Sequence, residues 1–351
     1  MRHMVRTQQL AVGIRGESRT WLVTGVAGFI GSHLLETLLR LDQHVVGLDN
    51  FSTSTQDNLN EVQATLPAGQ WDRFRLIQGD ITDPATCATA CADVDYVLHE
   101  AALASVPKSI EQPARTHRVN VSGHLNMITA AQRAKVRRFV YASSSAVYGS
   151  NPALPTREDQ PLEPISPYGA SKAINETYSQ TFGRAYGIET VGLRYFNVYG
   201  PRQDPQGAYA AVICRWSLDL LNHKRATIFG DGKNTRDFCY VADIVKANLQ
   251  AATVENPVAI HQVYNIGSGR AISLLDLHEM MQALHPNPSG EPDLLKPVFK
   301  DSRAGDARHS LADISRAQQF LGFHPRSTLE EGLRSTMEWY QHSRFLTPVM
   351  A

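Results

Sequence analysis

A tyrosine and a lysine four residues apart in the segment SPYGASK have the types and spacing of an acid-base pair. Ser166 is a suitable N-cap and Pro167 suits the first helical position, so a helix is expected to begin here. Tyr168 and Lys172 then share one helix face, where the ammonium group and the helix dipole can lower the tyrosine pKa. A tyrosine base at neutral pH needs its pKa lowered by about 3 units from about 10. An isolated pattern of this kind is more often an ordinary helix start.

A glycine-rich turn, TGVAGFIG, lies between the first apolar run and the first expected helix. Gly25, Gly28 and Gly31 let the backbone approach a pyrophosphate at the positive end of that helix. Asp49 closes the next expected strand eighteen residues after Gly31. A carboxylate there accepts both adenosine ribose hydroxyls and repels a 2'-phosphate, so the segment predicts NAD rather than NADP.

A hydroxyl-rich segment, SSSAVYG at residues 143–149, follows another expected strand. It ends on the same topological edge as the glycine turn, where open α/β sheets bind ligands. This placement favours the catalytic interpretation of Tyr168, because a bound nicotinamide would add positive charge beside it.

The elements that must position these residues alternate along the chain. The apolar runs are WLVTG, HVVGLDN, RFRLIQGD, DYVLHEAA, RRFVYASS, TVGLRYFN and VYNIG, and the helical stretches include residues 30–41, 114–134 and 168–186. Such alternation predicts an α/β fold, a Rossmann-type doubly wound parallel sheet with a smaller C-terminal α/β substrate-binding lobe. We expect an N-terminal extension over residues 1–19, a dinucleotide-binding domain over 20–197 to which later segments return, and mainly the substrate lobe over 198–345.

Composition narrows the class of partner. Lysine plus arginine and aspartate plus glutamate both number 34 in 351 residues. This balance gives no global field for nucleic acid or an anionic membrane surface. The four cysteines form no CxxC pair, and no metal site is expected. Without a signal-peptide core or an apolar run long enough to span a membrane, the sequence predicts a soluble cytoplasmic protein.

Taken together, these motifs and LRYFNVYG at residues 193–200 resemble the extended short-chain dehydrogenase/reductase family, specifically its nucleotide-sugar enzymes. The resemblance runs from about residue 20 to residue 340. It implies tightly bound NAD, a C-terminal lobe that holds a UDP-sugar, and a homodimer formed through a four-helix bundle with two helices from each subunit.

The resemblance also implies roles for individual residues. The catalytic set is Ser144, Tyr168 and Lys172. The cofactor-binding set is Gly25, Gly28, Phe29, Ile30, Gly31, Asp49, Asn50, Ser52, Asp80, Ile81, Ala101, Ala102, Asn120, Tyr168, Lys172 and Tyr195. The substrate-binding set is Ala104, Ser105, Ser143, Ser145, Asn197, Gln203, Ala211, Val212, Arg236, Arg303, Asp306 and Ser310, with Asn197, Arg236 and Arg303 on the diphosphate and Asp306 on the uridine side or ordering its loop. Arg308 and His309 have no expected role.

The expected reaction follows from what stands after the catalytic hydroxyl. Family members first oxidise the sugar at C4, and the dehydratases and decarboxylases then use acids at the next positions. Here Ser145 and Ala146 occupy them. Elimination therefore lacks its proton donor and base, which leaves 4-epimerisation with NAD regenerated in every cycle.

Three small residues suggest which sugar is accepted. Bacterial members restricted to unacetylated hexoses carry bulkier residues where Ala104, Ala211 and Ser310 stand. The volume gained suits a C2 acetamido group, to which Ser145, Gln203 and Ser310 could hydrogen-bond. The stretches AALASVPKSI, PRQDPQGAYAAVI and RAGDARHS resemble 4-epimerases for UDP-N-acetylglucosamine and UDP-N-acetylgalactosamine used in bacterial surface polysaccharide synthesis.

Three alternatives stay open at the sequence level. A 4-epimerase of UDP-N-acetylhexosaminuronic acids would need basic residues near C6, a role for which Arg202 and Lys108 are the candidates. A true NAD-dependent oxidoreductase would release its ketosugar. A non-catalytic nucleotide-binding regulator is disfavoured because Ser144, Tyr168 and Lys172 are all present.

Overall fold

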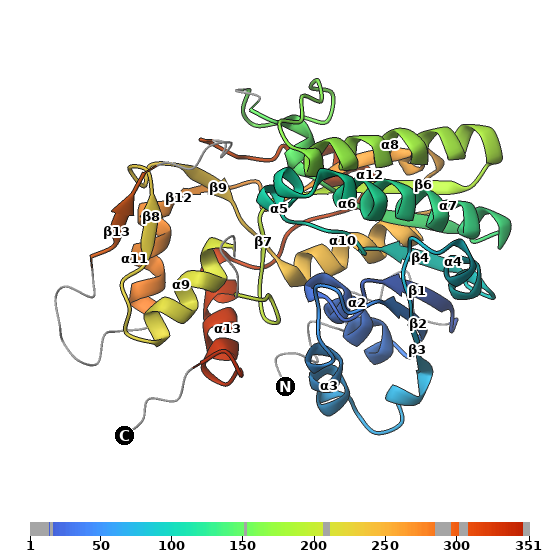
Figure 1. The fold of residues 1–351 in the computed structure, drawn as a ribbon, viewed down its shortest axis with the longest axis horizontal. Coiled ribbons are helices and arrows are strands. Elements are labelled where there is room, and N and C mark those ends of the chain that lie inside the picture. The colour runs from blue at the N-terminus through green and yellow to red at the C-terminus, as the bar shows by residue number, and fades with distance from the viewer. Residues whose placement is uncertain are drawn as a thin grey trace.

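Seven parallel strands form the central sheet of this protein, in the order β11-β6-β5-β4-β1-β2-β3 (Figure 1). The computed structural model describes residue 14 and residues 17–150, 153–205, 211–284, 296–301 and 308–346. The strands are β1 (Thr20–Thr24), β2 (His44–Asp49), β3 (Phe74–Gln78), β4 (Tyr96–His99), β5 (Arg138–Ser144), β6 (Glu189–Tyr195) and β11 (Gln262–Ile266). Each corresponds to one of the seven predicted apolar runs, so the predicted Rossmann-type parallel sheet is confirmed.

The strand order reverses at β1, which pairs with β2 on one side and β4 on the other. Because the strands are parallel, the chain leaves β1 and β4 at the same edge and departs in opposite directions. A crevice at such a switch point is where doubly wound sheets bind their ligands. The fold therefore brings the glycine turn after β1 close to the residues after β4.

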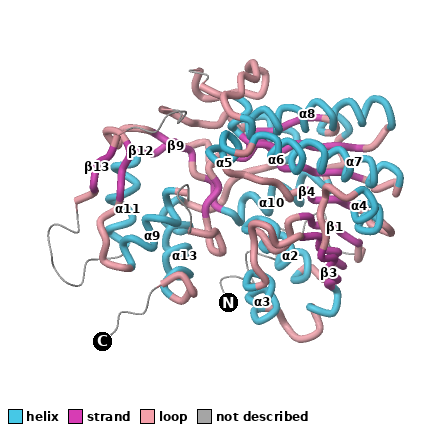
Figure 2. The backbone as a smooth tube through the Cα atoms, viewed as in Figure 1, coloured by secondary structure: helices cyan, strands magenta, loops and turns pink. Residues whose placement is uncertain are grey.

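Helices cover both faces of the sheet (Figure 2). One face carries α2 (Phe29–Arg40), α3 (Asp57–Thr65), α10 (Val241–Thr253) and α12 (Ser315–Leu321), and the other carries α4 (Pro84–Cys91), α7 (Gly123–Arg133) and α8 (Pro167–Tyr186). In β1, Trp21 and Val23 pack toward the α2 side, whereas Leu22 packs toward α4 and α7. Both faces of the strand are buried, which explains its continuous apolar run.

The helix predicted over residues 114–134 is interrupted in the structure. It divides into α6 (Pro113–His117), a π-helical turn (Arg118–Ser122) and α7. Such turns insert one residue and are often found at functional sites. Here the turn carries Asn120, whose side-chain amide bonds both the N–H and the carbonyl of Leu103.

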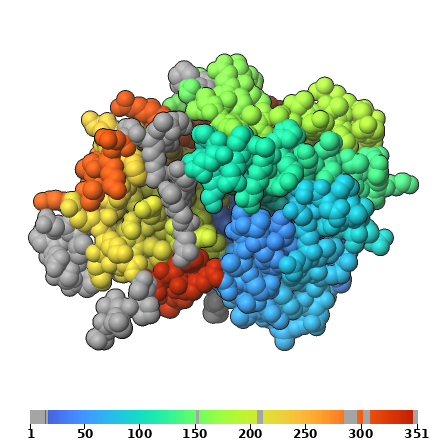
Figure 3. All heavy atoms as spheres, viewed as in Figure 1, coloured from blue at the N-terminus to red at the C-terminus, as the bar shows by residue number. Residues whose placement is uncertain are grey.

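A second lobe packs beside the sheet and has its own apolar core, formed in part by Trp216, Ile228, Leu277 and Met337. It contains α9 (Val212–Leu221), β8 (Thr227–Phe229), β9 (Thr235–Asp237), β12 (Ala271–Ser273), α11 (Leu274–Leu284), β13 (Val298–Lys300) and α13 (Leu329–Gln341). On the face shown in Figure 3, yellow-to-red residues of this lobe gather on one side and blue residues of the sheet domain on the other. Within the described part of the chain, no helix is long and apolar enough to cross a membrane.

Candidate active site

The glycine turn packs tightly against the backbone that follows β4 at the switch point. Gly25 has φ +67°, and a Cβ there would lie 3.0 Å from the backbone nitrogen of Ala101, just after β4. A Cβ on Gly31 would overlap the carbonyl oxygen of Gly25. Only glycine suits these two positions, so the turn keeps free N–H groups at the start of α2 as a cradle that fits a pyrophosphate.

The residues predicted to contact the adenosine lie at the carboxyl ends of β2 and β3. The Asp49 carboxylate accepts hydrogen bonds from the Ala27 N–H at 3.0 Å and the Phe51 N–H at 2.8 Å. The Asn50 amide donates to Asp80 at 2.8 Å and accepts from the Ser52 N–H at 3.0 Å. Burial opposes ionisation of Asp80, but the Thr82 N–H and the Asn50 amide hold its pKa below its usual range.

Three other predicted cofactor residues have mainly packing roles in this structure. The Ile81 side chain lies in the apolar core against Gly123, and its carbonyl accepts from the Asn126 amide at 3.1 Å. Phe29 and Ile30 open α2 and pack against the core of the second lobe. These contacts fix the position of the cradle relative to the second lobe.

The predicted start of α8 is confirmed in its local geometry. The Ser166 hydroxyl accepts the Gly169 N–H at 3.1 Å, and Pro167 is the first helical residue. Such a cap contributes about 1 kcal/mol of helix stability and fixes where the first turn points. Tyr168 therefore stands in the first turn, with Lys172 one turn further on.

The pKa of Tyr168 departs from the expected direction. Burial raises it, a hydrogen bond with Ser144 lowers it and the Glu100 carboxylate raises it, with a net upward shift. The Lys172 ammonium lies 6.0 Å from the Tyr168 ring centroid and donates to the carbonyl of Ala142 at 2.8 Å. Burial lowers the pKa of Lys172 itself to about 8, although Glu100 and Glu176 raise it. The lowering expected from Lys172 is not among these causes, and desolvation of the phenol sets the direction of the shift.

Ser143 and Ser144, the last two residues of β5, have different roles. Ser144 caps the turn that follows it by accepting the Ala146 N–H at 3.1 Å, and it also bonds Tyr168. The hydroxyl of Ser143 is buried and donates to Glu176 at 2.5 Å, and Glu176 forms an ion pair with Arg194 at 2.7 Å. The side chain of Ser143 is committed to this buried network, in contrast to the substrate contact we expected.

Glu100 is a charged residue at the site that sequence reasoning missed. The Tyr195 hydroxyl donates to Glu100 Oε1 at 2.8 Å and accepts from the Asn248 amide at 2.7 Å. Burial raises the pKa of Glu100 to about 7, against the lowering effects of Tyr195 and Lys172. An acid directly after an apolar strand at the ligand-binding edge, within VLHEAA, was the available signal.

Two of the three diphosphate candidates, Asn197 and Arg236, lie close together at β9. The Asn197 amide donates to the carbonyl of Asp237 at 3.0 Å, next to Arg236 in β9. The Arg236 guanidinium donates to the carbonyls of Thr235 and Arg308, at 2.9 and 3.2 Å. Arg303 and Asp306 lie outside the described residues.

Residues 308–310 run alongside β9 as a short parallel bridge. The Ser310 N–H donates to the carbonyl of Thr235 at 3.1 Å, and the Thr235 hydroxyl bonds the His309 ring at 2.9 Å. Arg308 forms an ion pair with Asp231 at 3.5 Å. Arg308 and His309, which had no expected role, thus hold Ser310 beside Arg236.

The remaining sugar candidates lie on three separate segments. Ala104 is exposed, Ser105 caps α5 (Val106–Glu111), and Ala211 precedes α9, which begins at Val212. The Gln203 amide donates to the carbonyl of Val198 at 3.2 Å, and its backbone carbonyl accepts the Tyr340 hydroxyl at 2.5 Å. The buried side-chain oxygen of Gln203 has no hydrogen-bond partner among the described residues.

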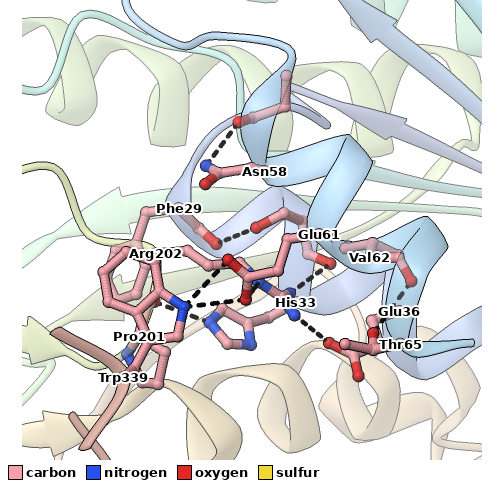
Figure 4. Close-up of polar contacts among 12 residues, drawn as sticks. Phe29, His33, Glu36, Asn58, Glu61, Val62, Thr65, Pro201, Arg202 and Trp339 are labelled. Atoms are coloured by element: carbon pink, nitrogen blue, oxygen red, sulfur yellow. Dashed lines mark hydrogen bonds and ion pairs between the residues drawn. The ribbon is translucent and has the colours of Figure 1, made fainter. Parts of the chain in front are cut away.

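Arg202 has a different environment from the sugar contact considered for it. Its guanidinium is buried between the lobes and forms ion pairs with Glu36 of α2 at 2.5 Å and Glu61 of α3 at 2.9 Å. Trp339 of α13 donates to the same Glu61 carboxylate at 2.9 Å. His33 bonds the carbonyl of Pro201 at 3.0 Å, as Figure 4 shows. Arg202 is therefore part of a polar latch, defined by these residues, that joins the nucleotide-binding helices to the second lobe.

Lys108, the other basic residue considered for C6, is exposed on α5. No group of three or more His, Cys, Asp or Glu side chains in the described ranges could hold a metal ion.

Residues 21–267 match the NAD-dependent epimerase/dehydratase family, and the chain belongs to this family. Its cofactor is NAD. A UDP-glucose 4-epimerase of Mycolicibacterium smegmatis is 38% identical over 323 residues, which cover 92% of this chain and 98% of that relative.

Two solved structures are similar along their whole length. A UDP-N-acetylglucosamine 4-epimerase from Methanobrevibacter ruminantium M1, in complex with UDP-N-acetylmuramic acid, has a TM-score of 0.84 at 37% identity and covers 93% of this chain and 99% of its own. A UDP-glucuronic acid 4-epimerase from Bacillus cereus, in complex with UDP-glucuronic acid and NAD, has a TM-score of 0.81 at 32% identity and covers 92% and 99%. The chain thus groups with UDP-sugar 4-epimerases whose substrates differ.

Proposed function

We propose that this protein interconverts UDP-N-acetylglucosamine and UDP-N-acetylgalactosamine by 4-epimerisation with tightly bound NAD. The observation that carries the choice of sugar is the set of small residues at Ala104, Ala211 and Ser310. The position of Ser310 beside Arg236 supports it, since a diphosphate held by Arg236 would bring the attached sugar near Ser310. The unpartnered oxygen of Gln203 is suited to accept an amide N–H.

The glycine cradle and Asp49 fit the cofactor of the family, with the cradle at the pyrophosphate and Asp49 at the adenosine ribose. When bound, NAD would supply the acceptor for the hydride of sugar C4 and the donor for its return to the other face, and its nicotinamide would add positive charge beside Tyr168. Lys172 lies on the same side as Tyr168 and would hold the nicotinamide ribose.

Tyr168 takes the proton of the sugar O4 hydroxyl in the first half of the cycle and returns it in the second. Ser144, which bonds Tyr168, orients the same hydroxyl. Because burial raises the pKa of Tyr168, its ionisation depends on the cations that surround it in the loaded site. Ser145 and Ala146 supply no acid for elimination, so the ketosugar is reduced again.

A uronic acid substrate is the second candidate, favoured by the similarity to the Bacillus cereus enzyme. The burial of Arg202 between Glu36 and Glu61 counts against it, because that guanidinium already balances two carboxylates. Lys108 is then the remaining cation of the two considered for a C6 carboxylate, and it is exposed to solvent.

The test is substrate profiling of the purified protein. We expect the anomeric NMR signals of UDP-N-acetylgalactosamine to convert to an equilibrium mixture with UDP-N-acetylglucosamine without added NAD. UDP-galactose and UDP-glucuronic acid serve as comparison substrates. If the N-acetylated sugar does not react while another UDP-sugar does, the proposed specificity is wrong but the 4-epimerase activity stands; accumulation of NADH with release of a ketosugar would indicate an oxidoreductase.

A further inference from the structure

Glu100 is a carboxylic acid that the reaction above does not use, although it lies beside the proposed catalytic residues. It follows β4 at the switch-point crevice, where a Cβ on Gly25 would lie 3.3 Å from its backbone carbonyl carbon. Its carboxyl group accepts the Tyr195 hydroxyl at 2.8 Å. Its charge also acts on both Lys172 and Tyr168. A carboxyl group in this position influences the charge of the reacting centre.

A chain of two hydrogen bonds holds the Glu100 side chain in place. The Asn248 amide of α10 donates to the Tyr195 hydroxyl at 2.7 Å, and Tyr195 in turn donates to Glu100. Tyr195 ends β6 and Glu100 follows β4, so two strands and a helix fix this chain of bonds. A group fixed in this way exerts a constant field, because it does not reorganise during the reaction.

The titratable groups that interact with Glu100 are Tyr195 of β6 and Lys172 and Tyr168 of α8, with Cys239 of β10 (Cys239–Tyr240) behind Tyr195. His99, its neighbour in β4, is buried, which lowers its pKa to about 3 and keeps it neutral. Burial raises the pKa of both Tyr195 and Cys239, so these are neutral as well. The Lys172 ammonium of α8 is then the cation that Glu100 balances among these groups.

We propose that Glu100 is an electrostatic positioning residue whose carboxylate balances the Lys172 ammonium and favours the oxidised, cationic nicotinamide over its reduced, neutral form. This rests on the proposed placement of the nicotinamide beside Tyr168 and Lys172. In the first half-reaction a hydride would leave sugar C4 for the ring and the O4 proton would go to Tyr168; in the second half-reaction both would return to the sugar. The ring loses its positive charge in this step, so a nearby negative charge opposes it. Glu100 thereby lowers the fraction of enzyme that holds NADH and the ketosugar intermediate.

The protonation state of Glu100 then sets the strength of this effect. Its pKa of about 7 lies above the usual range of a glutamate, because the carboxylate is desolvated. Above that pH the carboxylate is charged and opposes reduction of the cofactor. Below it the acid is neutral, and the opposition is lost.

The experiment compares the wild-type holoenzyme with Glu100→Gln, which keeps the shape and the bond from Tyr195 but carries no charge. Each bound cofactor is equilibrated with a redox dye couple of known potential, and the ratio of NADH to NAD is read from its absorbance. At pH 8.5 we expect the ratio in Glu100→Gln to exceed that of the wild type by at least about tenfold, because one unit charge at an effective dielectric constant of about 20 is worth about 1.4 kcal/mol even at a separation of about 12 Å. At pH 6 the difference should shrink, since Glu100 is then neutral.

Matched variants separate charge from structure. Asp219→Asn removes a half-buried carboxyl group of α9, whose pKa burial also raises, and should behave as the wild type at both pH values. Glu100→Asp keeps the charge and should keep the pH dependence. A shift in Glu100→Gln that is equal at both pH values, or no shift at all, overturns the proposal.

A measurement on the wild type alone covers the case in which Glu100→Gln does not fold. Chemical reduction of the bound cofactor with borohydride should raise the pKa of Glu100, so that the infrared carbonyl band of a protonated acid grows on reduction at about pH 7.5. If no such band responds to reduction, the proposal fails. Neither readout needs a sugar substrate, so failure here is distinct from failure of the proposed substrate specificity.

Discussion

At the residue scale, position 310 separates acetylated from unacetylated sugars in the proposed function. The Ser310 N–H is bound to the Thr235 carbonyl, so its backbone stays in place when the side chain changes. We expect Ser310→Tyr to reduce kcat/KM for UDP-N-acetylgalactosamine on the order of 100-fold, while UDP-galactose changes by less than about tenfold, since only the acetamido group needs the volume. Ser310→Ala, which adds no volume, should cost about tenfold at most. Coupled assays with both sugars test this; equal losses in Ser310→Tyr would disprove the gatekeeper role.

At the element scale, the polar latch joins α2 and α3 to the second lobe through a buried guanidinium. Breaking a buried ion pair from one side leaves an uncompensated charge, so Arg202→Met should lower the free energy of unfolding by about 3–5 kcal/mol. Arg334→Met, in an exposed pair with Glu330, is the matched control and should cost less than about 1 kcal/mol. Urea unfolding measures both, and similar values for the two variants would contradict the latch.

The latch also gives the protein an acid-sensitive component of stability. Burial raises the pKa of Glu36, but Arg202 outweighs it and holds the pKa at about 2, below the usual 4.5. Because the pKa of Glu36 is lower in the folded state than in the unfolded state, its contribution to stability is fully present above the unfolded-state pKa. This contribution is lost as the pH falls from about 4.5 toward 2. Part of the acid destabilisation in this window should therefore be missing from Glu36→Gln. Urea unfolding of both proteins at intervals from pH 6 to pH 2.5 checks it; parallel curves would count against this assignment.

At the scale of the whole molecule, the proposed homodimer would bury one face of α8. Ile174 and Tyr178 lie one turn apart on this helix and are each 37% exposed, although both are large and apolar. Apolar residues repeated on one face are typical of a helix that packs against a second copy. We expect Ile174→Glu to convert the dimer to monomer in size-exclusion chromatography with light scattering. Val258→Glu, at an exposed apolar residue outside α8, should leave the dimer intact; a wild-type monomer would refute the proposal.

The sequence by itself determined the elements whose signals are local. All seven strands of the sheet were predictable because each is a short apolar run between polar turns, and the start of α8 because Ser166 and Pro167 act within one helical turn. The glycine turn was predictable because its conformation depends on the missing Cβ atoms of nearby residues.

Only the tertiary structure decided what depends on distant neighbours and on burial. It placed Arg202 between two carboxylates more than a hundred residues away, and it interrupted a regular helical pattern at Asn120 so that this side chain could bond Leu103. It also joined Glu100 to Tyr195, ninety-five positions later. The physical reason is that desolvation and paired charges set ionisation and side-chain contacts, and both arise only when segments that are remote in sequence pack together.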